Sequence, residues 1–198
     1  MTEALPEWFH PGPPGGWTAD MLDHLPPDAP QHVELIDGSL IFRSPQTAFH
    51  MFALRLFENL DPPEHLTVIR EMTVTLGLRQ RPEPDILLVK KSAIFAQTTT
   101  FQPEDVHLVA EVVSDESAER DRTTKPIKYS GAGIRHFWRV EQEDGLPVVH
   151  TFELEPAVKV YVPTGIHRKR LRTHVGFDVD IDLTLEWPPA SDQSTPGI

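Results

Sequence analysis

One nearly continuous apolar run, His107-Leu-Val-Ala-Glu-Val-Val113, holds a single carboxylate in its interior. A strand that is apolar on both faces is typical of the centre of a sheet that is covered on both sides. A charged Glu111 in such a strand costs several kcal/mol unless a cation or hydrogen-bond donors compensate it. The run therefore predicts a central strand and a compensating partner for Glu111.

The patterns around this strand predict one α/β domain. Asp37-Gly38 lies between two apolar runs within residues 32–43, which is a strong hairpin signal because both residues tolerate positive φ. Apolar residues at helical spacing predict a helix over residues 45–60. A second helix is predicted over residues 120–132, closed by Gly133. Further strands are predicted at residues 66–78, 84–89, 135–140, 147–154, 157–162 and 175–185. This order predicts an α/β fold with a central mixed sheet flanked by helices and an antiparallel strand extension.

The chain of 198 residues is long enough for one domain with a real core. Residues 1–17 are rich in Pro and Gly and are expected to form a flexible N-terminal arm. Residues 18–186 are expected to form the single domain, and residues 187–198 a C-terminal tail. No apolar run approaches the roughly 20 residues that a membrane helix needs. We therefore expect a cytoplasmic protein that has no contact with a membrane.

Composition narrows the possible chemistry. The absence of cysteine excludes disulfides, thiolate nucleophiles and cysteine-ligated zinc. The net charge of −12 argues against a protein that coats nucleic acid through a broad basic surface. A local basic run, Arg168-Lys-Arg170 with Arg172, could still contact phosphate, although such runs are usually solvated faces. Tight binding to DNA is therefore not expected without a divalent metal.

Two further residues combine with Glu111 into a candidate site. Asp85 opens the apolar strand Ile86-Leu-Leu-Val89, and Lys125 lies 14 residues beyond Glu111 near the start of the next helix. Carboxylates at the ends of neighbouring strands are suitable hard ligands for a divalent ion, Mg²⁺ (or Mn²⁺). Two acids and a lysine around such an ion are the groups that phosphodiester hydrolysis needs.

The chain also resembles a known family, the Uma-type branch of restriction endonucleases within the PD-(D/E)XK nuclease superfamily. The resemblance spans about residues 18–140 and rests on the following elements: Glu34-Leu-Ile-Asp-Gly38, His50, Pro84-Asp85, Glu111-Val-Val-Ser114, Asp121, Lys125, Tyr129, Gly131-Ala-Gly133 and Trp138. It implies a restriction-endonuclease-like fold, DNA as the partner, and a homodimer that can cut both strands.

The resemblance also implies which residues act. It implies that the catalytic residues are Asp85, Glu111, Lys125, Glu34 and His50, and that the metal is held by Asp85, Glu111 and Val112.

Three departures from the family pattern lie close to this site. Val113 occupies the position where the wider superfamily has its lysine, so Lys125 on the helix is expected to replace it. Pro126 follows Lys125 directly, and a proline disfavours the helical conformation of the residue before it. Ser114-Asp-Glu-Ser117 also replaces a Ser-Pro-Ser-Thr-like turn and adds two acids beside the site.

Each candidate residue also has a purely structural interpretation. Glu111 could be a buried carboxylate that is satisfied by an arginine, and Glu34 could be the polar face of a hairpin rather than a third acid. His50 could cap or pack against its helix. Asp121 and Tyr129 could order Lys125, although Asp121 could equally be a helix N-terminal charge.

Three functions stay open on the sequence alone. The first is metal-dependent cleavage of DNA. The second is a catalytically inactive module with the nuclease fold that binds nucleic acid or a protein partner. The third is a structural or interaction protein with no role at nucleic acid.

Overall fold

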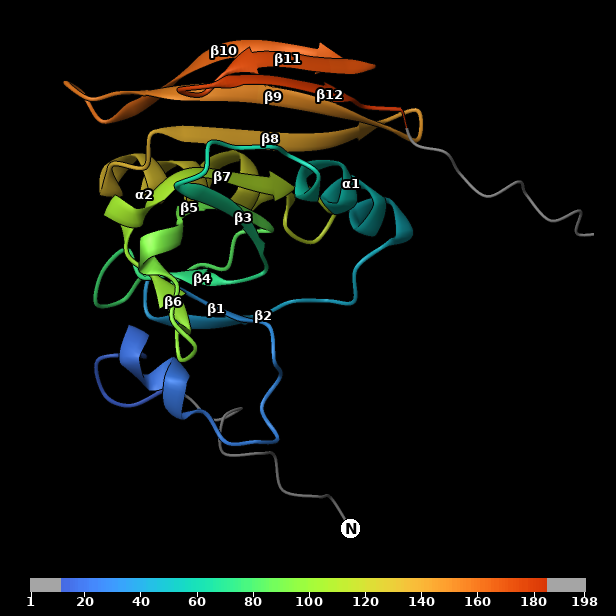
Figure 1. Ribbon diagram of the computed structural model, residues 1–198. Helices are drawn as coiled ribbons and strands as arrows, with labels where there is room; N and C mark the ends of the chain where they lie inside the picture. Colours follow the sequence, from blue (N-terminus) through green and yellow to red (C-terminus); the bar gives the residue numbers. More distant parts are fainter. Residues whose placement is uncertain (1–11, 185–198) are drawn as a thin grey trace, which may run out of the picture.

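Strand β7 (Val106–Val112) lies inside a mixed sheet, as its apolar sequence predicts (Figure 1). In the computed structural model, which describes residues 12–184, the sheet has six strands in the order β10-β9-β8-β7-β5-β3. β7 runs parallel to β8 (His136–Glu143) and antiparallel to β5 (Ile86–Lys90). The other three strands are β3 (Leu66–Arg70), β9 (Leu146–Glu155) and β10 (Val160–Arg168).

Helices and small strand pairs cover both faces of this sheet. On one face, α1 (Ala48–Glu58) packs with the hairpin of β11 (Arg170–His174) and β12 (Asp178–Asp182). On the other face lie α2 (Lys125–Ala132) and the parallel pair β4 (Thr73–Val74) and β6 (Thr100–Phe101). The predicted α/β fold with a mixed sheet between helices is therefore confirmed.

A first hairpin, β1 (Val33–Ile36) and β2 (Ser39–Phe42), is attached to the segment that leads into β5. Its turn has the positive φ angles that were predicted, 51° at Asp37 and 79° at Gly38. Leu35 and Arg81 exchange backbone hydrogen bonds of 3.0 and 2.8 Å. This pairing holds β1, which is buried at all four positions, next to the start of β5.

Two parts of the sheet differ from the predicted strands. The expected strand over residues 66–78 is interrupted at Glu71, where φ is 50° and the backbone N–H donates to the Asp85 carbonyl. β11 was not predicted, because its basic residues were interpreted as a charged run. Three of the four basic residues are in fact paired locally: Arg168 with Glu143, and both Arg170 and Arg172 with Asp180.

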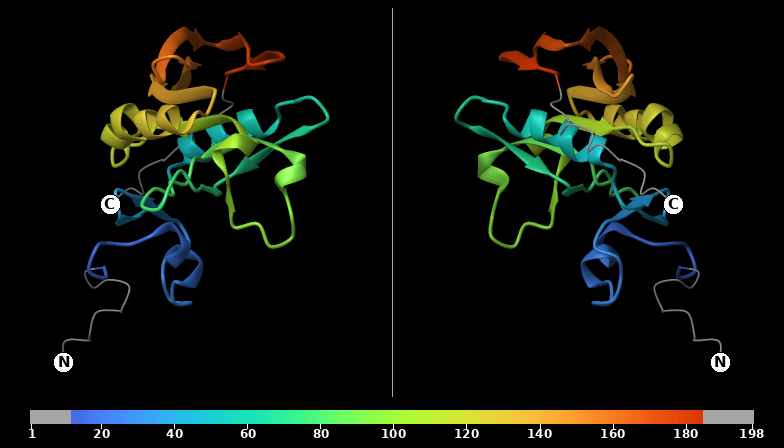
Figure 2. Two further views of the ribbon diagram at one scale, coloured as in Figure 1. Left: turned by 90° about the vertical axis from the view of Figure 1, so that its left-hand side faces the viewer. Right: turned by 90° about the vertical axis from the view of Figure 1, so that its right-hand side faces the viewer.

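Short helical turns connect the strands. Within residues 12–184 they are three 3₁₀ turns and one π-helical turn. The 3₁₀ turns are η2 (Ala19–His24), η3 (Lys91–Ala93) and η4 (Pro103–Asp105), and the π-helical turn is η5 (Arg120–Thr124). In the view of Figure 2, η2 and the first hairpin lie at the opposite end of the molecule from β10, β11 and β12. Within the described residues, no helix has the length and apolar character needed to cross a bilayer.

The predicted terminal segments are described only in part. Residues 1–11 of the expected arm and the whole expected tail, 187–198, lie outside the described residues. At the end of the arm, the Trp17 backbone N–H donates to the Gly38 carbonyl at 3.0 Å, so this residue is attached to the first hairpin. The division into arm, domain and tail stays a prediction.

Packing of α1 against the sheet leads to a first testable prediction. Phe57 is fully buried and its ring lies 5.9 Å from the ring of Trp138, centroid to centroid. Phe57→Ala is expected to lower the free energy of unfolding by about 3–5 kcal/mol, because it leaves a cavity in the core. Phe95 is 70% exposed, so Phe95→Ala should change the free energy by less than about 0.5 kcal/mol. Urea unfolding measures both, and equal effects would contradict this packing.

Candidate active site

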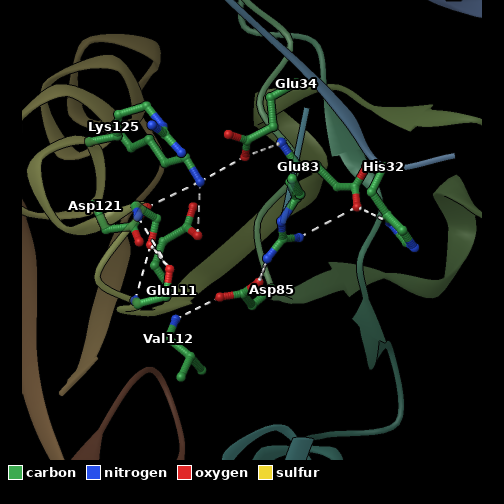
Figure 3. A network of polar contacts seen from close by, with 12 residues as sticks. His32, Glu34, Glu83, Asp85, Glu111, Val112, Asp121 and Lys125 are labelled. Carbon is green, nitrogen blue, oxygen red and sulfur yellow. Dashed lines mark hydrogen bonds and ion pairs between the residues drawn. The ribbon is translucent and has the colours of Figure 1, made fainter. Parts of the chain in front are cut away.

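Side chains from segments far apart in the sequence converge at one end of β5 and β7 (Figure 3). The pairing register of the two strands explains why two acids meet there. Ile86 of β5 pairs with Ala110 of β7 in antiparallel register, so Asp85 lies opposite Glu111 one step further on. Directly opposite residues of antiparallel strands have Cβ atoms about 4.5–5.5 Å apart. The predicted meeting of these two acids at adjoining strand ends therefore follows from the register.

Glu111 is compensated from α2. The Tyr129 hydroxyl donates to Oε1 at 2.5 Å, and the Lys125 ammonium donates to Oε2 at 3.1 Å. Burial raises the pKa of Glu111 well above its usual value, although the charge of Lys125 opposes this. Glu111 is thus paired with a lysine and a tyrosine. It is not satisfied by an arginine, as a purely structural role for this carboxylate had suggested.

Lys125 lies among three carboxylates. Its Nζ is 2.7 Å from Glu34, 3.1 Å from Glu111 and 3.2 Å from Asp121. Burial alone would lower the pKa of Lys125, but these acids outweigh it and hold the pKa well above its usual value. The lysine is therefore a permanently charged group at the centre of the site.

The π turn explains how Lys125 is helical although Pro126 follows it. The Lys125 backbone N–H donates to the carbonyl of Arg120, five residues back, and Lys125 itself has helical angles. Pro126 then falls in the first turn of α2, where its missing N–H is tolerated. The π turn is wider than an α-helical turn and accommodates Pro126 without a break between η5 and α2. Such turns are frequent at functional sites.

Asp85 has three partners. Its Oδ2 accepts the Val112 backbone N–H at 2.7 Å, and its Oδ1 lies 3.1 Å from His50 Nε2 and contacts Arg43 Nη2. Burial would raise the pKa of Asp85, but His50 and Arg43 hold it below its usual range. The Val112 side chain packs in the core on the other face, so any metal ligand from Val112 must be a backbone oxygen.

The remaining predicted residues also face this site. Glu34 points inward from the buried strand β1, where it contacts Lys125 and accepts the Glu83 backbone N–H at 3.1 Å. The His50 backbone N–H donates to the capping Thr47 hydroxyl at 3.3 Å, while its ring reaches Asp85. Asp121 is buried, which raises its pKa, so it is not an exposed helix-terminal charge.

Sequence reasoning missed two residues of this network, Arg43 and Glu83. Arg43 follows β2 and contacts Asp85 and Glu83, and Glu83 also lies 2.6 Å from His32 Nδ1. Burial raises the pKa of Glu83, and the hydrogen bond from His32 opposes this. Glu83 directly precedes Pro84-Asp85, and this position was a signal for a site residue. Arg43 carries no local signal, because its partners come from a segment 40 residues later.

The donor set suits a hard divalent cation. Glu34, Asp85 and Glu111 offer carboxylate oxygens, which Mg²⁺ and Mn²⁺ prefer. Across residues 12–184, no group of three or more His, Cys, Asp or Glu side chains is arranged as a ready-made metal site. Lysine, arginine and histidine nitrogens lie against these oxygens instead. The residues therefore fit such an ion in chemistry, and their present partners would have to rearrange.

Comparison with solved structures identifies the class of fold. The chain is similar to the crystal structure of a putative nuclease belonging to DUF820 from Anabaena variabilis, with a TM-score of 0.60. The match has 15% sequence identity and covers 79% of this chain and 88% of that chain. At this identity the similarity shows the fold alone, which is an α/β fold shared with that protein.

The sequence itself identifies the family. The chain belongs to the Uma2 family, described as "Putative restriction endonuclease", whose model matches residues 19–186. The predicted resemblance is therefore confirmed. A search of curated proteins found no match.

The polar contact of Tyr129 leads to a second prediction. Tyr129→Phe removes a hydrogen bond to buried Glu111 and should lower the free energy of unfolding by about 1.5–3 kcal/mol. Tyr161 provides a matched control, since its hydroxyl donates to the neutral Ile134 carbonyl at 2.8 Å. Tyr161→Phe should cost only about 0.5–1.5 kcal/mol. Chemical denaturation at neutral pH compares them, and a smaller effect at Tyr129 would contradict the charged contact.

Proposed function

We propose that this protein is a metal-dependent endonuclease that hydrolyses phosphodiester bonds of DNA. Its active site would consist of Asp85, Glu111 and Lys125. The observation that carries the proposal is the buried ammonium of Lys125, 3.1 Å from Glu111 and in the same network as Asp85. Two acids and a lysine are the groups that this hydrolysis needs around a divalent ion. Membership of the Uma2 family supports a nuclease.

The charge balance of the site supports a divalent cation. Five buried carboxylates, those of Glu34, Glu83, Asp85, Glu111 and Asp121, contact one lysine and one arginine. Asp85, Glu111 and a backbone oxygen of Val112 would hold Mg²⁺ (or Mn²⁺). Such an ion, when bound, polarises the phosphoryl group and lowers the pKa of a bound water. It would also offset the excess of buried negative charge.

The protein's own groups orient one another. Glu34 and Asp121 hold the Lys125 ammonium from two sides, so its charge can offset the charge that develops on the phosphate. Tyr129 fixes Glu111 through Oε1, and His50 lies against Asp85 from the first turn of α1. In this proposal Lys125 acts on the phosphate. Glu34 positions Lys125, His50 positions Asp85 and Tyr129 positions Glu111.

The substrate would approach from the side of His50. A surface cavity of about 460 Å³ borders His50, which contacts Asp85, and Val113, which follows Val112. We propose double-stranded DNA as the substrate and a homodimer as the cutting unit in the cytoplasm. Exposed apolar side chains on the edge strand β10, namely Val160, Val162 and Ile166, support association of two copies.

One observation favours a second candidate, an inactive module with the nuclease fold that binds nucleic acid or a protein. Arg43 and Lys125 already compensate Asp85 and Glu111 without any metal. If these ion pairs are permanent, the carboxylates serve only stability. Cleavage and metal binding separate the two candidates.

Cleavage itself provides the third prediction. The protein should nick or cut duplex DNA with Mg²⁺ or Mn²⁺ but not with EDTA. Lys125→Met should reduce the cleavage rate on the order of 10²-fold or more, because it removes one preorganised electrostatic contact. Asp178→Asn alters a carboxylate of 98% exposure outside the site and should leave the rate unchanged.

The assay compares purified variants whose circular dichroism shows a folded state. Cleavage that continues in EDTA would contradict the metal-dependent proposal. Equal rates for wild type and Lys125→Met would remove Lys125 from the chemistry. Absence of cleavage with either metal would favour the inactive module.

Binding of DNA provides the fourth prediction. With a net charge of −12, and with three of the four residues in the basic run paired to acids, the free protein should bind DNA weakly. Ca²⁺ should raise the affinity about tenfold or more, because it neutralises acids that repel phosphate. Fluorescence anisotropy with Ca²⁺ or EDTA measures this in wild type and Glu111→Gln. Equal affinity in all four conditions would show that Glu111 does not link metal to DNA.

A further inference from the structure

Arg43 lies where a cation bound to Asp85 would lie. Its Nη2 contacts Asp85 Oδ1, and its Nη1 lies 3.5 Å from Glu83 Oε1. The side chain is only 11% exposed, so the guanidinium belongs to the interior network rather than to the surface. Burial would lower the pKa of Arg43, but Asp85, Glu111 and Glu34 together raise it. The guanidinium is thus within electrostatic reach of three of the predicted site acids.

The two oxygens of Asp85 leave little room for a second cation. Oδ2 already accepts the Val112 backbone N–H at 2.7 Å. Oδ1 is shared by Arg43 and by His50 Nε2 at 3.1 Å. A metal ion that binds through Oδ1 would stand beside a permanently charged guanidinium, and two cations at such a distance repel strongly in a buried site.

Arg43 is also the cation that can leave. Lys125 is held by three acids from three segments and is 3% exposed. Arg43, in contrast, follows β2 and precedes the exposed residues 44–47. Glu83 lies next to Arg43 and would remain a partner of the guanidinium once the contact with Asp85 is broken.

We infer that Arg43 is the resident counter-ion of Asp85 and that a divalent ion must displace it from Asp85 in order to bind. This inference rests on the proposed function, in which Asp85 is a metal ligand. Arg43 therefore sets the metal concentration at which the site becomes loaded. It also holds the Asp85 carboxylate in place while no metal is bound.

Binding of Mn²⁺ to the full chain, measured by isothermal titration calorimetry, tests this inference. Arg43→Met should bind Mn²⁺ about tenfold or more tightly than wild type, because the competing charge is removed. Arg43→Lys keeps a positive charge and should bind close to wild type, which separates charge from packing. Arg135→Met is the control, since Arg135 pairs with Glu153 and lies before the start of β8, away from the residue opposite Glu111. Its affinity for Mn²⁺ should equal that of wild type.

Three outcomes would overturn the inference. Equal affinity of wild type and Arg43→Met would overturn the role of Arg43 but leave the metal site standing. Tighter binding that persists in Arg43→Met with Asp85→Asn would place the ion elsewhere. No binding in any variant would overturn both this inference and the proposed function.

Wild type allows a measurement that does not depend on the folding of Arg43→Met. The side-chain Nε–Hε resonance of Arg43, assigned by its loss in Arg43→Lys, should shift as Mg²⁺ is titrated. A resonance that stays in place while Mg²⁺ binds would also overturn the inference.

Discussion

The contact between Lys125 and Glu111 is the interaction on which the rest of the site depends. It lies between the centre of the sheet and α2, and it draws in Glu34 from β1 and Asp121 from the π turn. A buried charge without a partner costs several kcal/mol, so each of these segments is constrained to bring its side chain to the same point. The fold is therefore organised around a group of charges as much as around its apolar core.

The arrangement of strands turns this constraint into a candidate site. Successive side chains of a strand point to opposite faces of the sheet. Asp85 and Glu111 therefore lie on the face that α2 covers, while Ile86, Ala110 and Val112 pack toward α1. The two acids are then held by different cations, Arg43 and Lys125. The chain belongs to a family described as "Putative restriction endonuclease". In the proposed function, this difference between the two cations lets Arg43 leave Asp85 when a metal ion binds while Lys125 stays at Glu111.

Much of this could be predicted from the sequence, because the informative residues break a local pattern. A carboxylate inside an apolar strand pointed to Glu111, and Asp37-Gly38 predicted the first hairpin and its positive φ angles. Arg43 could not be predicted, since its partners are distant in sequence. The rule that a proline disfavours the helical conformation of the residue before it also fails at Lys125. This rule does not take into account the π turn that precedes α2. The roles of these residues in catalysis stay a prediction.

Anomalous diffraction from crystals soaked in Mn²⁺ tests the central claim most directly. If the buried acids are held for a divalent ion, a manganese peak should lie within about 2.0–2.3 Å of carboxylate oxygens of both Asp85 and Glu111. Arg43 should then have left Asp85, with Lys125 still against Glu111. A fully soaked crystal with no peak at these acids, and with the Arg43–Asp85 contact intact, would contradict the account and favour a purely structural network.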